Sequence, residues 1–257
     1  MPRETALITG AASGIGRPLA RCFAPDADEL VLVARREDAL EEVARELTDA
    51  HGITAHIIPQ DLADPEAPRA LFERLATDGT TVDVVVNNAG FGARGTVAEL
   101  PLERQLDMVQ VNVTALTHLT RLFLPGMLDR RRGGVLNVAS TAAFQPGPNM
   151  AVYYATKAYV LSFTEGLAEE VRGTGLTVTC LAPGPTETRF AERAGTEGTW
   201  LTALGEMDAT DVARAGYEGF RAGKTLVVPG LTNKIGALGV RFVPRALVRK
   251  VVRSLQA

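Results

Sequence analysis

A tyrosine and a lysine four residues apart are the first candidates for chemistry in this chain. Tyr153 and Lys157 lie in a segment, 151–171, whose apolar residues recur at helical spacing, so the two polar groups project from the same face of a helix. A free tyrosine titrates near ~10, and a cation beside the phenol lowers its pKa toward the neutral range. The pair is a candidate for acid–base chemistry. From these residues alone a solvated tyrosine and a solvated lysine on an ordinary helix is the commoner case, so the other segments must decide.

A glycine-rich turn near the start of the chain predicts a phosphate site. Residues 5–9 form a short apolar strand, 10–16 read Gly-Ala-Ala-Ser-Gly-Ile-Gly, and 17–23 are helix-like. Glycines permit a tight turn and a close approach of the backbone to a pyrophosphate, and the helix N-terminus offers free N–H groups. The flanking strand and helix favour this interpretation over a turn that binds nothing.

Two arginines follow the second predicted strand, 30–34. At this place in dinucleotide-binding folds an acid binds a free ribose 2′-hydroxyl, whereas an arginine accommodates a 2′-phosphate. Here Arg35 and Arg36 come first, and Glu37 and Asp38 follow them. The alternative is that both arginines are solvated at the start of the helix at 37–50, where two cations oppose the helix dipole. The pattern favours NADPH over NADH.

Strand-like and helix-like segments alternate along the chain. Further strands are expected at 54–59, 83–86, 134–139, 176–182 and 226–229, and helices at 65–76, 101–128 and 151–171. This alternation predicts an α/β fold with a doubly wound parallel sheet of about seven strands and helices on both faces. No linker or repeat interrupts the pattern, so we expect a single domain over 1–257.

The chain resembles the short-chain dehydrogenase/reductase family over about residues 5–230. The matching residues are Thr9-Gly10-x-x-x-Gly14-Ile15-Gly16, Asn87-Asn88-Ala89-Gly90, Asn112, Ser140, Tyr153-x-x-x-Lys157 and Pro183-Gly184 with Thr188. The resemblance implies a Rossmann-type fold, an NAD(P)-dependent oxidoreductase and a homodimer or homotetramer.

The resemblance also implies the catalytic roles. Tyr153 would be the general acid in carbonyl reduction, or the base in oxidation; the family spacing selects it over Tyr154. Lys157 would lower the pKa of the phenol and bind the nicotinamide ribose. Ser140 would hydrogen-bond the substrate oxygen, and Asn112 would anchor a water in a proton relay.

The cofactor contacts are implied in the same way. Asp61 and Leu62 would flank the adenine, and Thr188 would bond the carboxamide. The complete set of expected cofactor contacts is Gly10, Ser13, Gly14, Ile15, Gly16, Arg35, Arg36, Asp61, Leu62, Asn88, Ala89, Gly90, Tyr153, Lys157, Pro183, Gly184, Thr186 and Thr188.

The segment 189–207 has no strand pattern, and the resemblance implies that it is a substrate loop or lid. We expect large apolar side chains to face the cleft from this segment and from other loops: Phe190, Trp200, Leu201, Leu204, Met207, Phe91, Phe144 and Met150. They predict an apolar ketone or aldehyde as substrate. The alternative is that these side chains form a small core beneath the loop.

The C-terminal segment 234–257 is basic, contains no acid, and has one apolar face at helical spacing. It predicts an amphipathic helix. Such a helix can lie on an anionic membrane surface, or it can pack on its own domain or on a second subunit, which we favour.

Composition narrows the function classes. With 257 residues, 22% charged residues and a net charge of -3, the chain is typical of a globular protein and unlike a nucleic-acid scaffold. We expect no signal peptide, no membrane span and a cytoplasmic location. Cys22 and Cys180 are expected as buried thiols, and the three histidines lack metal-ligand spacing, so we expect no structural metal.

Together these features predict an NADPH-dependent reductase acting on a ketone or aldehyde. Two alternatives stay open. One is an alcohol dehydrogenase working in the oxidative direction, and the other is an NADPH-binding regulatory or partner protein with little turnover. The presence of both Tyr153 and Lys157 argues against the second.

Overall fold

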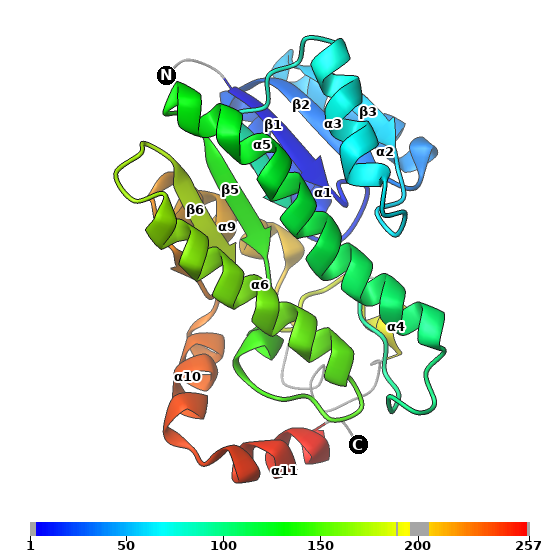
Figure 1. The fold of residues 1–257 in the computed structure, drawn as a ribbon, viewed down its shortest axis with the longest axis vertical. Helices are drawn as coiled ribbons and strands as arrows, with labels where there is room; N and C mark the ends of the chain where they lie inside the picture. The colour runs from blue at the N-terminus through cyan, green and yellow to red at the C-terminus, as the bar shows by residue number, and fades with distance from the viewer. Residues whose placement is uncertain (1–3, 189, 196–205, 256–257) are drawn as a thin grey trace.

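The computed structural model describes residues 4–188, 190–195 and 206–255. Its centre is a parallel sheet of seven strands in the order β3-β2-β1-β4-β5-β6-β7 (Figure 1). The predicted fold class is therefore confirmed. The strands are β1 (Glu4–Thr9), β2 (Ala27–Ala34), β3 (Thr54–Pro59), β4 (Val84–Asn87), β5 (Gly134–Val138), β6 (Thr177–Leu181) and β7 (Leu226–Val227).

Helices cover both faces of the sheet. One face carries α1 (Gly16–Phe23), α2 (Glu37–His51) and α9 (Ala209–Arg221), and the other carries α3 (Ala67–Thr77), α5 (Leu116–Arg130) and α6 (Ala151–Glu170). Alternate strand residues point to opposite faces, so Ile8 packs in the first core and Leu7 in the second. Burial on both faces explains why the central strands are continuous apolar runs.

The helical region predicted at 101–128 is divided. It contains α4 (Leu102–Val109), a π-helical turn (Gln110–Ala115) and α5. The turn contains Asn112, whose side chain is buried. π-helical turns within α-helical regions are frequent at functional sites. No periodic pattern in the sequence predicted this one.

The C-terminal segment differs from the single predicted helix. It contains α10 (Leu231–Gly239), a short 3₁₀ turn (Val240–Phe242) and α11 (Arg245–Leu255). Val243 is extended, with φ -105° and ψ 135°, because the proline that follows it disfavours the helical region. Pro244 thus ends one helical stretch and begins another. Among the described residues, no helix has the length and apolar character needed to span a bilayer.

Buried amides join the sheet to the helices behind the site. Asn87 donates to Asn137 (2.9 Å) and to Thr120 of α5 (3.1 Å), and Asn137 donates to Thr164 of α6 (3.0 Å). All four side chains are buried. Because hydrogen bonds in a low-dielectric core are specific and costly to break, they fix α5 and α6 against β4 and β5.

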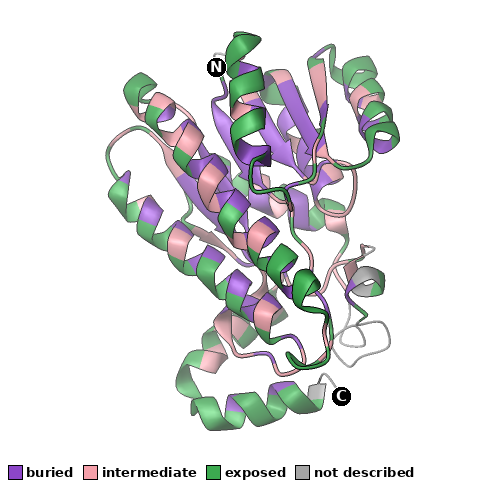
Figure 2. Ribbon diagram, turned by 45° about the vertical axis from the view of Figure 1, so that its right-hand side comes forward, coloured by how far each residue is buried: buried purple, intermediate pink, exposed green. Residues whose placement is uncertain are grey.

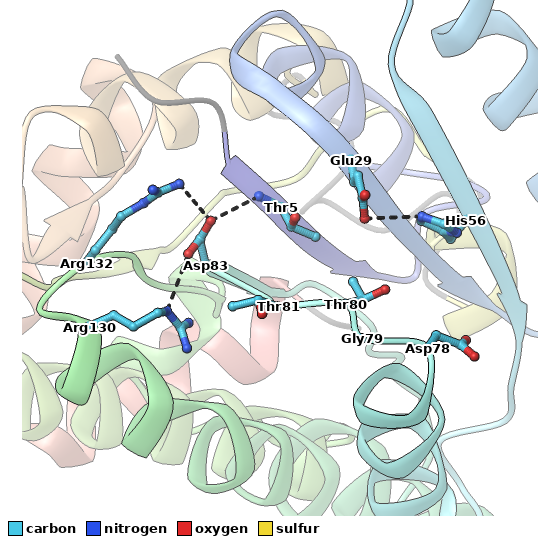
Figure 3. A pocket seen from close by; sticks show the side chains of 10 residues that line it. All are labelled: Thr5, Glu29, His56, Asp78, Gly79, Thr80, Thr81, Asp83, Arg130 and Arg132. Atoms are coloured by element: carbon cyan, nitrogen blue, oxygen red, sulfur yellow. Dashed lines mark hydrogen bonds and ion pairs between the residues drawn. The ribbon is translucent and has the colours of Figure 1, made fainter.

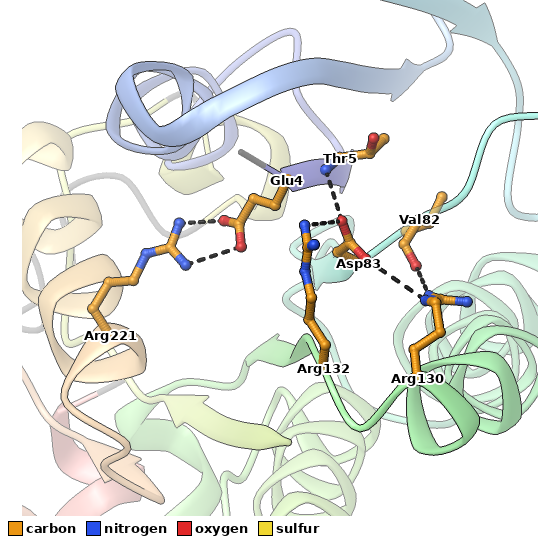
Figure 4. Close-up of polar contacts among 7 residues, drawn as sticks. All are labelled: Glu4, Thr5, Val82, Asp83, Arg130, Arg132 and Arg221. Atoms are coloured by element: carbon orange, nitrogen blue, oxygen red, sulfur yellow. Dashed lines mark hydrogen bonds and ion pairs between the residues drawn. The ribbon is translucent and has the colours of Figure 1, made fainter. Parts of the chain in front are cut away.

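The amino ends of the central strands are held by a charged cluster (Figure 4). The Asp83 carboxylate, directly before β4, accepts a hydrogen bond from Arg132 (2.9 Å) and from the Thr5 backbone N–H (3.3 Å). The Nε atom of Arg130 is 3.8 Å from the same carboxylate. A polar hollow of about 550 Å³ opens beside this cluster (Figure 3). It contains none of the predicted site residues.

Candidate active site

A cleft of about 590 Å³ opens at the carboxyl ends of the strands. Gly16 and Asn112 are the two predicted site residues that do not line it. The others do, and they come from segments far apart in the chain: Gly10, Ser13, Gly14, Ile15, Arg35, Arg36, Asp61, Leu62, Asn88, Ala89, Gly90, Ser140, Tyr153, Lys157, Pro183, Gly184, Thr186 and Thr188.

The glycine-rich turn leaves its backbone bare toward this cleft. Gly10 and Gly14 have φ of +67° and +58°, a conformation that favours glycine. A Cβ on Gly16 would lie 2.2 Å from the Gly10 carbonyl oxygen, so the third glycine allows α1 to pack against the turn. No side chain caps the first turn of α1. Bare N–H groups at a helix N-terminus beside a cleft fit a pyrophosphate.

Thr9 positions the segment Asn87-Asn88-Ala89-Gly90, a role that the sequence did not predict for it. Its hydroxyl accepts hydrogen bonds from the backbone N–H groups of Asn88 and Ala89, each at 3.0 Å. The Asn88 side-chain amide donates back to the Thr9 carbonyl at 2.8 Å. The sequence did contain a signal for this role, because Thr9 is a polar residue at the end of an otherwise apolar strand. These bonds fasten β1 to the segment after β4 on the floor of the cleft.

The two arginines lie at the other end of the cleft. Arg35 and Arg36 are exposed and directly precede α2. The Arg35 guanidinium is 3.9 Å from the Asp61 carboxylate, and both side chains are more than half exposed, so the attraction between them is weak. Both arginines are available to an anionic group bound in the cleft.

Tyr153 is the buried phenol of the site. Its ring lies 5.3 Å from the ring of Phe190 and 6.0 Å from that of Tyr154. Burial raises the pKa of Tyr153 above its ordinary value, and a side-chain hydrogen bond with Ser140 opposes this rise. The phenol therefore carries its proton at neutral pH.

Lys157 is buried behind the tyrosine. Its ammonium donates to the Val138 carbonyl oxygen at 2.8 Å and lies 6.0 Å from the centre of the Tyr153 ring. Burial lowers the pKa of Lys157 to about 8. The phenol pKa is therefore not lowered as expected: burial of Tyr153 raises it, and Lys157 is not among the groups that shift it.

Asn112 lies behind Lys157 instead of in the cleft wall. Its side-chain oxygen accepts from the Phe91 N–H (3.1 Å), and its amide donates to the Phe91 carbonyl (3.0 Å) and the Thr156 hydroxyl (3.0 Å). A Cβ on Gly90 would lie 3.0 Å from the Asn112 oxygen and 3.3 Å from the Lys157 nitrogen. Asn112 thus ties the π-helical turn to the segment after β4, through Phe91, and to α6, the helix that contains Tyr153.

Apolar side chains surround the phenol, but not all of the predicted ones. Phe91, Met150 and Phe190 line the cleft. Phe144 packs in another cluster, and Met207 packs against the core on the α1 side, so both predictions are wrong. Trp200, Leu201 and Leu204, with most of the predicted lid, lie outside the described residues.

The C-terminal helix α11 also reaches this region, which the sequence did not indicate. Val248 and Val252 are buried in the same apolar cluster as Met150, Tyr153 and Tyr154. The last helix therefore belongs to the apolar cluster that contains Tyr153, although it is almost a hundred residues further along the chain.

Known proteins are similar to this chain in sequence and in fold. Residues 4–198 match the short chain dehydrogenase family model. The chain is 33% identical to a short-chain dehydrogenase from Sphingobium yanoikuyae in complex with NADPH, covering 93% of this chain and 94% of that one, with a TM-score of 0.83. It is 28% identical to a Burkholderia phymatum short-chain dehydrogenase/reductase in complex with NAD, covering 93% and 92%, with a TM-score of 0.80.

A 7β-hydroxysteroid dehydrogenase is similar over nearly the whole chain. The identity is 25%, the coverage 98% of this chain and 97% of that one, and the TM-score 0.88. The chain belongs to the short-chain dehydrogenase/reductase family, as its motifs predicted. It is a nicotinamide-dependent oxidoreductase that acts on CH–OH or C=O groups of small molecules.

Proposed function

We propose that this protein reduces the carbonyl group of an apolar ketone or aldehyde with NADPH. The observation that carries the proposal is the buried Tyr153 phenol, hydrogen-bonded with Ser140 at the wall of the cleft, with Lys157 behind it. A phenol whose pKa is raised by burial holds a proton at neutral pH. That protonation state suits an acid that donates to a carbonyl oxygen. The reductive direction is supported by Arg35 and Arg36, which favour NADPH.

The residues divide the proton chemistry between them. As negative charge develops on the substrate oxygen, the Tyr153 hydroxyl donates its proton to it, and the Ser140 hydroxyl donates a hydrogen bond. The cofactor supplies the hydride when it is bound. Lys157 would hold the nicotinamide ribose and would return a proton toward Tyr153. Asn112 fixes the backbone around Lys157 through its bonds to Phe91 and Thr156, and we assign it the relay position.

The cleft also offers groups for each part of the cofactor. The glycine-rich turn and the start of α1 would hold the pyrophosphate. Asp61 and Leu62 would flank the adenine, and Thr188 would bond the carboxamide. The exposed guanidinium groups of Arg35 and Arg36 favour a 2′-phosphate over a free 2′-hydroxyl. These contacts support NADPH, although relatives bind either NADPH or NAD.

The apolar wall around the phenol supports a hydrophobic substrate. Phe91, Met150 and Phe190 line the cleft beside Tyr153, and such side chains gain free energy by covering apolar surface of a ligand. The similar 7β-hydroxysteroid dehydrogenase is consistent with a ring-bearing body. A small charged carbonyl compound would leave this wall without a partner.

The experiment is a spectrophotometric assay of NADPH and NADH oxidation with ketones and aldehydes of increasing apolar size. We expect kcat/KM to rise with apolar size and to be higher with NADPH. Replacing both arginines, Arg35→Ala with Arg36→Ala, should remove the cofactor preference, whereas Arg45→Ala on the exposed face of α2 should leave it intact. A preference for small charged substrates would contradict the apolar substrate. Equal use of NADPH and NADH by the unaltered protein would contradict the cofactor preference.

A further inference from the structure

The last two helices form a surface that the proposed chemistry does not use. We call residues 231–255, from α10 through α11, the C-terminal arm. The arm extends beyond the sheet and its covering helices (Figure 1) and is exposed along most of its length (Figure 2). No residue of α10 is buried.

An apolar stripe runs along α10 and the turn that follows it. Leu231, Ile235, Leu238 and Phe242 are separated by four, three and four residues, a spacing that places them on one face of a helix. Their exposed fractions lie between 57% for Leu238 and 81% for Phe242. Contiguous apolar surface of this kind marks a site of interaction with a protein or a membrane.

Helix α11 is anchored on one side only. Val248 and Val252 are buried against the cluster that contains Tyr153, so the expectation that this segment packs on its own domain holds for one side of α11. Leu247 and Val251 lie on the neighbouring flank and are about half exposed. Val240 also packs partly against this cluster. The anchor thus fixes the arm, while Leu231, Ile235, Leu238, Phe242, Leu247 and Val251 stay about half exposed or more.

The arm carries positive charge without any compensating acid. Residues 231–257 contain six lysines and arginines and no aspartate or glutamate, so the rest of the chain, with 21 cations and 30 acids, is strongly negative. The cations are Lys234, Arg241, Arg245, Arg249, Lys250 and Arg253, all of them exposed. None forms an ion pair with a described acid.

The distribution of charge distinguishes between the possible occupants of this surface. A second copy docked with its own arm against this arm would bring six cations against six cations, which repel each other. An anionic bilayer attracts all six cations and also accepts the apolar stripe. We propose that the C-terminal arm is a docking surface for an anionic lipid membrane, with Phe242 and its stripe entering the interface. The arm lies at the apolar cluster around Tyr153, so docking brings the substrate side of the cleft toward the lipid.

The test is sedimentation of the full chain with lipid vesicles. Binding is expected to vesicles that contain phosphatidylglycerol, to be weak for phosphatidylcholine alone, and to fall as salt rises. Replacing three cations, Arg249→Ser with Lys250→Ser and Arg253→Ser, should weaken binding roughly a hundredfold. Replacing Ile235→Ser with Phe242→Ser should weaken it about tenfold or more.

Matched variants on other helices control for general loss of charge or apolar surface. Arg45→Ser with Arg69→Ser and Arg74→Ser removes three exposed cations, and Leu102→Ser with Leu106→Ser removes two exposed leucines; both proteins should bind vesicles like the original. Thermal unfolding and NADPH binding report whether each variant is folded.

Two outcomes would overturn the proposal. One is equal binding of the unaltered protein to both kinds of vesicle, or to neither. The other is a loss of oligomer in analytical ultracentrifugation when Ile235 and Phe242 are replaced, with vesicle binding unchanged, which would assign the stripe to a second copy of the chain.

Discussion

At the scale of single residues, spacing identified the chemical groups and burial determined their protonation. The four-residue separation of Tyr153 and Lys157 was readable from the sequence, as was the position of Ser140 in the family pattern. The direction of the tyrosine pKa was not, because spacing does not tell how far each group is removed from water. Burial raises the pKa of Tyr153, and the Lys157 ammonium, 6.0 Å from the ring centre, is not among the groups that lower it.

Lys157 predicts how the reductase depends on pH. Burial lowers its pKa from 10.5 to about 8, so the ammonium is present below pH 8 and is lost as pH rises through that value. Because reduction consumes a proton, kcat/KM with NADPH should be level below pH 8 and fall by up to about tenfold per pH unit above it.

The control for this pH profile is Lys157→Arg. Arginine keeps its charge throughout this range, so the residual activity of the variant should not decline between pH 8 and 10. An unaltered protein whose kcat/KM stays level to pH 10 would remove Lys157 from the proton path.

At the scale of elements, alternating strand and helix signals predicted the sheet, and the side-chain bonds between elements were not predictable. All seven expected strands are present; β3 has the expected ends, and the other six differ by one to three residues at one or both ends. The π-helical turn around Asn112 and the Asn87–Asn137 bond have no periodic signature, since each depends on which elements become neighbours in space. Helix α9 was absent from our expectations, although its apolar side chains Val212 and Phe220 pack in the main core.

The charged cluster at the amino ends of the strands predicts a stability effect separate from catalysis. Asp83 is largely buried and accepts from Arg132 and Thr5. Asp83→Asn removes the charge from these contacts and should lower the free energy of unfolding by about 2 kcal/mol, measured by urea denaturation.

Asp78→Asn is the matched control for that measurement. Asp78 borders the same hollow, but its carboxylate is 57% exposed and lies 3.9 Å from Arg74. Exposed pairs of this kind contribute little, so the change should stay within about 0.5 kcal/mol. Equal effects of the two substitutions would show that the Asp83 cluster does not hold the strand ends.

At the scale of the whole molecule, the candidate site lies at the carboxyl ends of the strands, and a charged cluster lies at their amino ends. The carboxyl edge gathers glycines, arginines and the buried phenol into one cleft, and the amino edge carries the Asp83 cluster. The sequence indicated the site at the carboxyl edge, because the candidate residues follow the predicted strands, but it did not indicate the Asp83 cluster. It did not indicate that Pro244 divides the C-terminal segment, or that Val248 and Val252 return to the site, since a helical pattern does not tell where a helix will dock.

The most direct test of the proposed reductase is Tyr153→Phe, which removes the phenolic oxygen and keeps the buried ring. We expect kcat for carbonyl reduction to fall by about 10²–10⁴-fold, while NADPH binding, measured by fluorescence titration, changes little. Tyr154→Phe is the control, because the neighbouring tyrosine is similarly buried, and it should retain most of the activity. A Tyr153→Phe protein that reduces the substrate at the original rate, with NADPH bound as tightly, would contradict the assignment of Tyr153 as the acid.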